Sequence, residues 1–262
     1  MTTALITGAT SGIGAAFARH LAQQGHDLVL VARTQARLDE SATDLRALHG
    51  VDVATIAADL TDDADCEAVA TAAADVDLLV NNAGLGLGMG FTDNPVSDED
   101  YLLDLNIRAV MRLTHAALKP MRQRGHGGII NVSSVAGFAP VMPGSTYNAS
   151  KAWVTNFSES MAPLARSAGV NLMALCPGFV RTEFHDRAAI EMADMPQWML
   201  LDADFVVESA MRDFLRGRVV SVPSVLYKAV SRLIHHAPNG LLARVATRAE
   251  VISRRGKTED QR

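Results

Sequence analysis

Residues 3–14 read TALITGATSGIG, a short apolar run followed by a glycine-rich turn. The run is typical of a buried strand. Ile13, Phe17 and Leu21 then recur at helical spacing, and Gly25 ends the pattern. A strand, a glycine turn and a helix begin a βαβ unit, in which backbone N–H groups and the helix N-terminus bind a pyrophosphate. The stretch therefore predicts a dinucleotide site, although a plain tight turn also uses glycine.

The same alternation of strand and helix continues along the chain. Hydrophobic residues make up 48% of the sequence and aromatic residues 5%, which suits a parallel sheet covered on both faces. We expect a single-domain Rossmann-type doubly wound α/β fold of about seven strands over residues 1–222, followed by an extension over 223–262. The further strands are predicted at 28–32, 52–58, 77–80, 129–132, 170–175 and 218–222.

Composition narrows the class of protein. The net charge of -5 gives no general attraction to nucleic acid. Cys66 and Cys176 form no disulfide framework, and no metal-ligand spacing surrounds them. No apolar run approaches the roughly 20 residues that span a bilayer. The N-terminus does not resemble a signal peptide, so we expect a cytoplasmic protein. Because the cysteines lack metal-ligand spacing, we expect no bound metal.

The stretch 127–151 concentrates polar side chains that can do chemistry. It reads GGIINVSSVAGFAPVMPGSTYNASK. Its β-branched run predicts a strand, so Ser134 would lie just past the carboxyl end, where open α/β sheets bind ligands. Tyr147 and Lys151 are four residues apart and would share a helix face. A hydroxyl, a phenol and an ammonium are thus predicted around one substrate atom.

Arginines follow the second predicted strand. An NAD-binding sheet usually presents an acid there, to hold the ribose 2′-OH. Here Arg33 follows the strand and Arg37 lies one helical turn beyond. A guanidinium binds phosphate oxygens through paired hydrogen bonds, so this site favours NADP(H) over NAD(H). The alternative is that Arg33 is an ordinary surface charge.

Other polar residues stand at strand ends or inside helices. Asp59 could accept a hydrogen bond from an adenine amino group, and Asn82 could fix its loop against the cofactor, or both could be turn formers. Thr61 is expected to cap the helix that reaches about Ala74. Asn106 lies inside a long helix predicted from Ser97 to about Arg122, where asparagine is a poor helix former. The alternative is a side chain that bonds its own backbone.

These residues together resemble the short-chain dehydrogenase/reductases in their single-domain form, over residues 3 to about 222. The resemblance implies an NADP(H)-dependent oxidoreductase. It identifies Asn106, Ser134, Tyr147 and Lys151 as the catalytic residues, with Ser134 preferred to Ser133 by its interval before the tyrosine. Its implied cofactor-binding residues, besides Tyr147 and Lys151, are Gly8, Thr10, Ser11, Gly12, Ile13, Gly14, Arg33, Asp59, Leu60, Asn82, Ala83, Gly84, Pro177, Gly178, Val180 and Thr182.

The implied reaction is hydride transfer, which reduces a ketone or aldehyde or oxidises a secondary alcohol. Tyr147 would be the general acid or base, Ser134 would stabilise the carbonyl oxygen, and Asn106 would hold a water near Lys151. A phenol with a pKa near 10 is poorly matched to neutral pH. A lysine charge about 4 Å away, worth roughly 4 kcal/mol, is expected to lower that pKa by about three units at most.

Apolar residues favour an apolar substrate. Those expected to contact it are Phe138, Met142, Phe184 and Met195. The Met-rich stretch 183–201 is either a lid over the ligand or a helix pair packed on the body. Pro163 should bend or end the helix that starts near Ser145.

The extension after residue 222 is basic and amphipathic, with an end expected to be disordered. Such a segment can make weak contact with an anionic membrane, or pack on its own domain or on a partner subunit. The resemblance implies a homodimer or homotetramer. Two rival functions stay open: a non-catalytic NADP(H)-binding sensor on the same fold, and a lyase or epimerase, which usually has a larger substrate domain.

Overall fold

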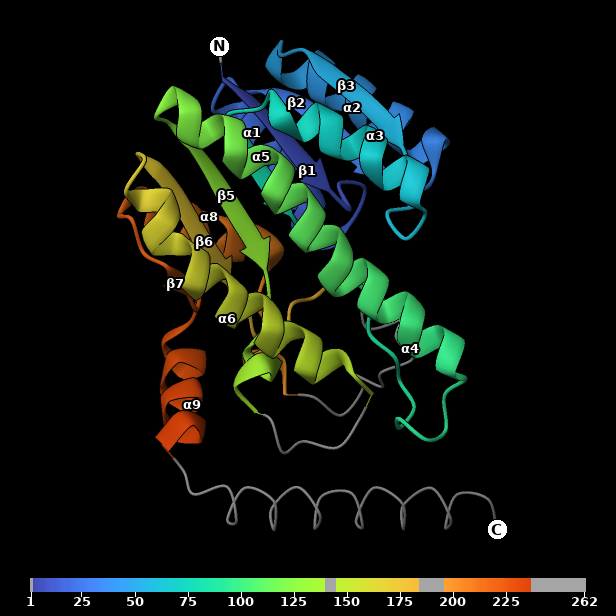
Figure 1. Ribbon diagram of the computed structural model, residues 1–262, viewed down its shortest axis with the longest axis vertical. Coiled ribbons are helices and arrows are strands. Elements are labelled where there is room, and N and C mark those ends of the chain that lie inside the picture. Colours follow the sequence, from blue (N-terminus) through green and yellow to red (C-terminus); the bar gives the residue numbers. More distant parts are fainter. Residues whose placement is uncertain (1, 140–144, 184–195, 237–262) are drawn as a thin grey trace.

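The computed structural model describes residues 2–139, 145–183 and 196–236, which build a parallel sheet between two layers of helices (Figure 1). The seven strands lie in the order β3-β2-β1-β4-β5-β6-β7, so the predicted doubly wound α/β fold is confirmed. The order reverses between β1 and β4, and such a reversal opens a ligand crevice at the carboxyl ends of the strands. The strands are β1 Thr3–Thr7, β2 Asp27–Ala32, β3 Val53–Ala57, β4 Leu78–Asn81, β5 Gly127–Val132, β6 Val170–Leu175 and β7 Val220–Ser221.

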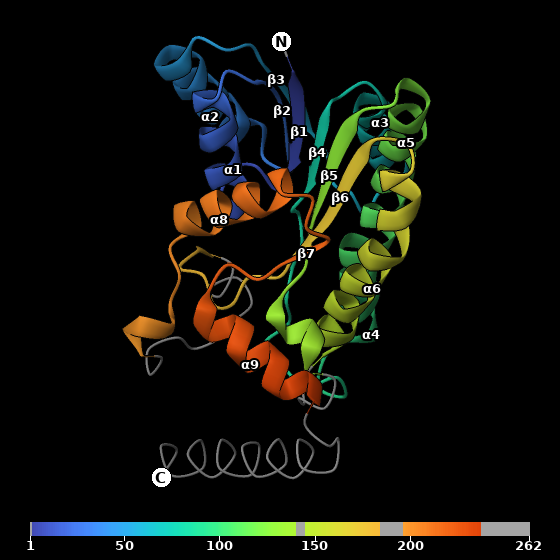
Figure 2. The same cartoon turned by 90° about the vertical axis from the view of Figure 1, so that its left-hand side faces the viewer.

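Helices cover both faces of this sheet (Figure 2). On one face lie α1 (Gly12–Gln23), α2 (Gln35–His49) and α8 (Ala203–Leu215). On the other lie α3 (Asp63–Ala74), α5 (Val110–Arg124) and α6 (Tyr147–Arg166). Shorter elements complete the described chain: α4 (Val96–Leu103), η1 (Asp104–Ala109), η2 (Val135–Phe138), η3 (Gln197–Met199) and α9 (Val225–His236).

The apolar residues form a core on each face of the sheet. Phe17 and Leu38 are fully buried on the α1 side, and Leu113 and Met121 on the α5 side. Burying each such side chain contributes about 1.5–3 kcal/mol. The two cores hold the strand ends in fixed positions, which a site built on those ends requires.

Several predicted boundaries were wrong in informative ways. Asp62, not Thr61, caps α3, because its carboxylate accepts from the N–H groups of Ala64 and Asp65. The helix expected over 97–122 is interrupted by the π-helical turn η1, which contains Asn106. Pro163 was expected to bend or end its helix, and it does not end α6, which continues to Arg166. A proline this close to the C-terminus removes a hydrogen bond from a ladder that is about to end.

The start of the C-terminal extension packs on the sheet domain. Strand β7 has two residues, fewer than the five expected over 218–222. Tyr227 of α9 is 3% exposed and packs with Ala174 and Cys176 of the β6 region. The domain boundary at 222 stays a prediction, and residues 237–262 lie outside the described part of the chain.

The described residues contain neither a membrane-spanning helix nor a metal-binding cluster. None of their helices is long and apolar enough to cross a membrane. Among them, no group of His, Cys, Asp and Glu side chains is placed to hold a metal ion.

Candidate active site

A glycine cradle lies between the end of β1 and the start of α1. Gly8 and Gly12 have φ values of 65° and 53°, a region that favours glycine. A Cβ on Gly14 would stand 2.2 Å from the carbonyl oxygen of Gly8, so a larger residue cannot occupy that position without moving the backbone. The loop therefore leaves its backbone bare at a helix N-terminus, an arrangement that fits the pyrophosphate of a dinucleotide.

The segment after β4 is fastened to this cradle. The Asn82 amide donates to the carbonyl oxygens of Thr7 (2.9 Å) and Gly8 (3.2 Å). The Thr7 hydroxyl accepts from the N–H groups of Asn82 and Ala83, both at 2.9 Å. Asn82 is thus more than a turn former, because it fixes the glycine loop to the neighbouring strand end.

Three of the predicted catalytic residues meet at the carboxyl end of β5. The Lys151 Nζ lies 5.7 Å from the centroid of the Tyr147 ring and donates to the carbonyl oxygen of Val132 at 3.1 Å. The side chains of Tyr147 and Ser134 are hydrogen-bonded to each other. The expectation that Tyr147 and Lys151 share a helix face is therefore met, and a hydroxyl joins them from the strand end.

The two adjacent serines have different surroundings. Ser133 is buried, donates to the carbonyl oxygen of Lys151 at 2.7 Å and lies 2.8 Å from the Thr155 hydroxyl. Ser134 is partly exposed and bonds the phenol of Tyr147. Ser133 thus anchors α6 to β5, and Ser134 faces the site.

Burial dominates the ionisation of the pair. It raises the pKa of Tyr147 to about 12, against the opposing effect of the hydrogen bond from Ser134. It also lowers the pKa of Lys151 to about 8. The expected lowering of the phenol's pKa was wrong for this structure, because desolvation penalises both the phenolate and the ammonium.

The side chain of Asn106 bonds the backbone of the loop at Leu85 and not the backbone of its own helix. Its amide donates to the carbonyl oxygen of Leu85 at 2.9 Å, and its carbonyl oxygen accepts from the N–H of Leu85 at 3.0 Å. A Cβ on Gly84 would lie 3.0 Å from Asn106 Oδ1 and 3.3 Å from Lys151 Nζ, so the three residues are close neighbours. Self-bonding of Asn106 to its own helix, the alternative reading, is not what the structure shows. A π-turn often marks a functional position in a helix.

The ends of β2 and β3 form a polar cluster at the edge of the crevice. Arg33 Nη1 donates to the hydroxyl of Tyr101 at 3.1 Å. That hydroxyl donates to the Asp59 carboxylate, also at 3.1 Å. Burial opposes ionisation of Asp59, but hydrogen bonds from Thr61 and Tyr101 and the charge of Arg33 outweigh it and lower its pKa. Leu60, the next predicted contact, is buried beside them.

The segment 177–182 lies against the same crevice. The Pro177 carbonyl oxygen accepts from the N–H of Val135, and the position of a Cβ on Gly12 is 3.0 Å from the Thr182 side chain. Val180 forms a parallel bridge with Leu201. Gly178 is needed because a Cβ there would stand 2.2 Å from the Tyr227 ring.

The predicted substrate contacts fall mainly on undescribed chain. Met142, Phe184 and Met195 lie outside the described residues, as does most of the predicted lid. Phe138 is half-buried and packs against the cluster that contains Tyr227. Contact of these side chains with a substrate therefore stays a prediction.

Sequence reasoning missed several residues beside the site. Tyr101 gave no local signal, because its contact with Arg33 and Asp59 depends on how α4 packs. Glu183 pairs with Arg37 at 3.1 Å, and Arg37 also donates to the Thr10 carbonyl oxygen. Arg37 thus ties α2 both to the glycine loop and to Glu183, the residue that follows segment 177–182.

Comparisons with known proteins agree with this geometry. A family model described as short chain dehydrogenase matches residues 2–192. The very-long-chain 3-oxoacyl-CoA reductase of Bos taurus is 30% identical over 93% of this chain and 78% of its own. A short-chain dehydrogenase from Sphingobium yanoikuyae in complex with NADPH is 36% identical, with a TM-score of 0.82 over 91% of this chain and 97% of its own. A short chain dehydrogenase/reductase from Burkholderia phymatum in complex with NAD is 29% identical, with a TM-score of 0.77 over 88% and 92%.

Proposed function

This chain belongs to the short-chain dehydrogenase/reductase family of oxidoreductases, and we propose that it reduces a ketone or aldehyde with NADPH. One observation carries the proposal. The glycine cradle of Gly8 to Gly14 and the cluster of Ser134, Tyr147 and Lys151 stand on one edge of one sheet. A bound dinucleotide and a carbonyl group would then meet beside a proton donor.

The cofactor-binding residues are assigned from the same edge. The glycine loop, with Thr10, Ser11 and Ile13, would hold the pyrophosphate. Leu60 and Asp59 would contact the adenine, and Ala83 with Gly84 the ribose side. Pro177, Gly178, Val180 and Thr182 would hold the nicotinamide end. When bound, NADPH supplies the hydride.

The protein's own residues handle the proton. Tyr147 donates its phenolic proton to the substrate oxygen as the carbonyl carbon accepts the hydride, and an alcohol results. Ser134 donates a hydrogen bond to the same oxygen and stabilises its developing charge. Lys151 stabilises the phenolate left on Tyr147. Asn106 holds the loop at Leu85 beside Lys151 and would position a water that returns the proton.

The ionisation of Tyr147 suits a proton donor. With a pKa raised to about 12, the phenol is protonated at neutral pH, as an acid must be. An alkoxide is a stronger base than a phenolate, so transfer from Tyr147 to the reduced oxygen is favourable.

Arg33 supports a preference for NADP(H) over NAD(H). It occupies the position after β2 where an acid would select the ribose hydroxyl. One structural neighbour holds NADPH and another NAD, so the preference is carried by Arg33 and not by the family.

The substrate is proposed to be apolar, such as an acyl or other bulky ketone. The very-long-chain 3-oxoacyl-CoA reductase relative acts on such a carbonyl, as its name states. Phe138, together with Met142, Phe184 and Met195 in the undescribed stretches, supplies the apolar side chains.

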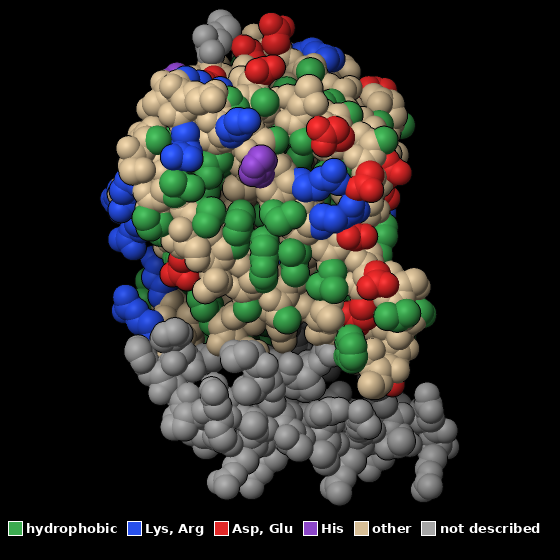
Figure 3. All heavy atoms as spheres, viewed as in Figure 1, with side chains coloured by type: hydrophobic (Ala, Val, Ile, Leu, Met, Phe, Trp, Pro, Cys, Tyr) green, Lys and Arg blue, Asp and Glu red, His purple; other side chains and the backbone are tan. Residues whose placement is uncertain are grey.

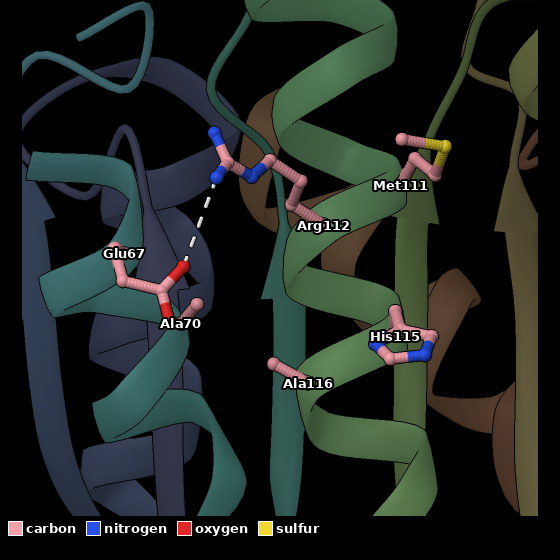
Figure 4. Close-up of a pocket in the computed structure, with 6 residues that line it drawn as sticks. All are labelled: Glu67, Ala70, Met111, Arg112, His115 and Ala116. Carbon is pink, nitrogen blue, oxygen red and sulfur yellow. Dashed lines mark ion pairs between the residues drawn. The ribbon is translucent and has the colours of Figure 1, made fainter. Parts of the chain in front are cut away.

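A homodimer or homotetramer remains part of the proposal. Hydrophobic side chains gather over α5 and α6 (Figure 3), where Met111 and Leu164 are 44% and 42% exposed. A depression of about 310 Å³ lies between α3 and α5, where Arg112 pairs with Glu67 at 3.7 Å (Figure 4). None of the predicted catalytic residues lines it, so it can be covered without blocking the site. Light scattering of the protein and of Met111→Asp would test this assembly.

The contacts of the C-terminal extension and the cellular location of the protein stay predictions. Val225 and Leu233 of α9 are exposed beside Lys228 and Arg232, which accords with a weak contact on an anionic membrane or a partner subunit. Cytoplasmic location is expected from the sequence alone.

The rival function is a sensor that binds NADP(H) without turnover. The purified protein should be given NADPH and a panel of aliphatic, aromatic, steroid and acyl ketones, with cofactor absorbance followed. Oxidation of NADPH that depends on a ketone supports the proposal. Tight NADPH binding without turnover across the panel would favour the sensor.

A further inference from the structure

Tyr101 connects three elements that are far apart in sequence. It projects from α4 to Arg33 after β2 and Asp59 after β3. Its hydroxyl accepts from Arg33 Nη1 at 3.1 Å and donates to Asp59 Oδ2 at 3.1 Å. One phenolic oxygen thus serves both charged groups.

Asp59 provides a fixed end for this bridge. Its carboxylate also accepts from the N–H of Thr61 at 3.0 Å and from the Thr61 hydroxyl at 2.8 Å. The N–H of Asp59 donates to the Asp65 side chain at 2.8 Å. Because the carboxylate is held from several sides, the phenol that binds it is held as well.

Arg33 gains an orientation that it would otherwise lack. An exposed arginine has a flexible stem, and fixing it costs about 2 kcal/mol of side-chain entropy. A guanidinium has five N–H donors, so one bond to Tyr101 leaves enough to bind two oxygens of a phosphate. Paying that entropy cost before the ligand arrives raises affinity for a phosphate in the right place.

The phenol also separates two opposite charges. Among the ion pairs of the described residues, none joins Arg33 to Asp59 within 4.0 Å, although both bind the same hydroxyl. A direct pair would neutralise the cation that a phosphate needs. Phenylalanine at this position would remove the bridge and let the guanidinium move onto the carboxylate.

Arg37 is less suited to select the phosphate. It pairs with Glu183 at 3.1 Å and donates to the Thr10 carbonyl oxygen at 3.4 Å. Arg37 thus forms a direct ion pair with an acid, whereas Arg33 reaches the Asp59 carboxylate through the Tyr101 hydroxyl.

We infer that Tyr101 is a specificity-determining residue, whose phenol holds Arg33 in position for the 2′-phosphate of NADP(H). Tyr101 acts through Arg33 and is therefore a positioning residue for that phosphate. The inference rests on the proposed preference of this site for NADP(H).

The test is a binding experiment that needs no substrate. Dissociation constants for NADPH, NADH, 2′,5′-ADP and 5′-AMP are measured by calorimetry or nucleotide fluorescence on wild type and Tyr101→Phe. We expect the variant to lose about tenfold or more in affinity for NADPH and 2′,5′-ADP, because a hydrogen bond to a charged group is lost. Affinity for NADH and 5′-AMP should change several-fold less. Ser97→Ala, which removes an exposed hydroxyl from the same helix, is the matched control and should bind all four like wild type.

A second pair of variants tests whether Tyr101 acts by positioning Arg33 or by stabilising the site as a whole. In an Arg33→Ala background, Tyr101→Phe should cause no further loss of 2′,5′-ADP affinity, since its effect passes through Arg33. An equal further loss would overturn the inference, as would an unchanged NADPH to NADH ratio in Tyr101→Phe alone. If wild type itself binds NADH as tightly as NADPH, the proposed cofactor preference fails and the inference with it. If wild type prefers NADPH and Tyr101→Phe keeps that preference, the inference alone fails.

Discussion

The carboxylate of Glu99 binds Thr146, the residue directly before Tyr147. It accepts from the Thr146 N–H at 2.9 Å and from the Thr146 hydroxyl at 2.6 Å. Asn94 donates to the same carboxylate at 2.8 Å, and Glu99 is 3% exposed. A buried carboxylate on α4 thus satisfies the N-terminus of the helix that carries Tyr147 and Lys151, where a negative charge is favoured.

Replacing Glu99 should therefore destabilise the protein. We expect Glu99→Ala to lower the free energy of unfolding by about 2 kcal/mol, because Thr146 loses a charged acceptor in a buried place. Urea denaturation measures this change. Asp100→Asn removes the neighbouring, exposed carboxylate and should leave the free energy of unfolding nearly unchanged. If both variants lose the same free energy of unfolding, the contact with Thr146 does not stabilise the protein.

The Glu99 contribution should also depend on pH. Burial opposes its ionisation, but hydrogen bonds from Thr146 and Asn94 outweigh that effect and lower its pKa. A lowered carboxylate pKa means that the stabilisation is present above the unfolded value and is lost as pH falls through the folded value. The stability difference between wild type and Glu99→Gln should shrink as the solution is acidified below about pH 4.5. A difference that stays constant on acidification would contradict this.

Lys151 should give a dependence of the same sign as that of Glu99, but at a higher pH. Its folded pKa of about 8 lies below the ordinary 10.5, so the unfolded state binds more protons between these values and stability rises with pH. Relative to Lys151→Met, wild type should gain about 2 kcal/mol from pH 7 to about pH 9.5. Lys119→Met, at an exposed position on α5, is the control and should show no such gain. A flat difference for Lys151→Met would show that the ammonium is better solvated than its burial indicates.

The glycine cradle can be tested at its tightest point. In Gly14→Ala, the new Cβ would lie 2.2 Å from the Gly8 carbonyl oxygen, so the loop must move. We expect loss of NADPH binding by at least about a hundredfold, with lowered thermal stability. Gly90→Ala, whose Cβ would meet the flexible end of the Asp93 side chain, should bind NADPH normally. Unchanged NADPH affinity in Gly14→Ala would reject this loop as the pyrophosphate site.

Arg33→Asp should shift cofactor preference toward NAD(H). The substitution places an acid where it repels a 2′-phosphate and can accept from a ribose hydroxyl. The ratio of kcat/KM with NADPH to that with NADH should fall by about a hundredfold or more, a loss of roughly 3 kcal/mol. Arg122→Asp, which changes an exposed arginine on α5, controls for net charge. An unchanged ratio would reject the 2′-phosphate contact.

Local patterns were enough to predict the strands, the glycine turn and the proximity of Tyr147 to Lys151. A strand of β-branched residues and an i, i+4 pair are short-range features, so Tyr147 and Lys151 could be placed together from the sequence. The contacts of Tyr101 and Glu99 could not, because they depend on how α4 packs against distant elements. The π-turn around Asn106 was missed for the same reason, since its bonds to Leu85 cross from another loop. The pKa of Tyr147 was misjudged because burial depends on the whole fold.

The proposed function depends above all on Tyr147 as the proton donor in an NADPH-dependent reduction. The most direct measurement compares wild type and Tyr147→Phe for ketone-dependent oxidation of NADPH, with the NADPH dissociation constant measured on both. We expect Tyr147→Phe to bind NADPH nearly as wild type does, while turnover falls by several orders of magnitude. Comparable turnover in the two proteins would contradict it.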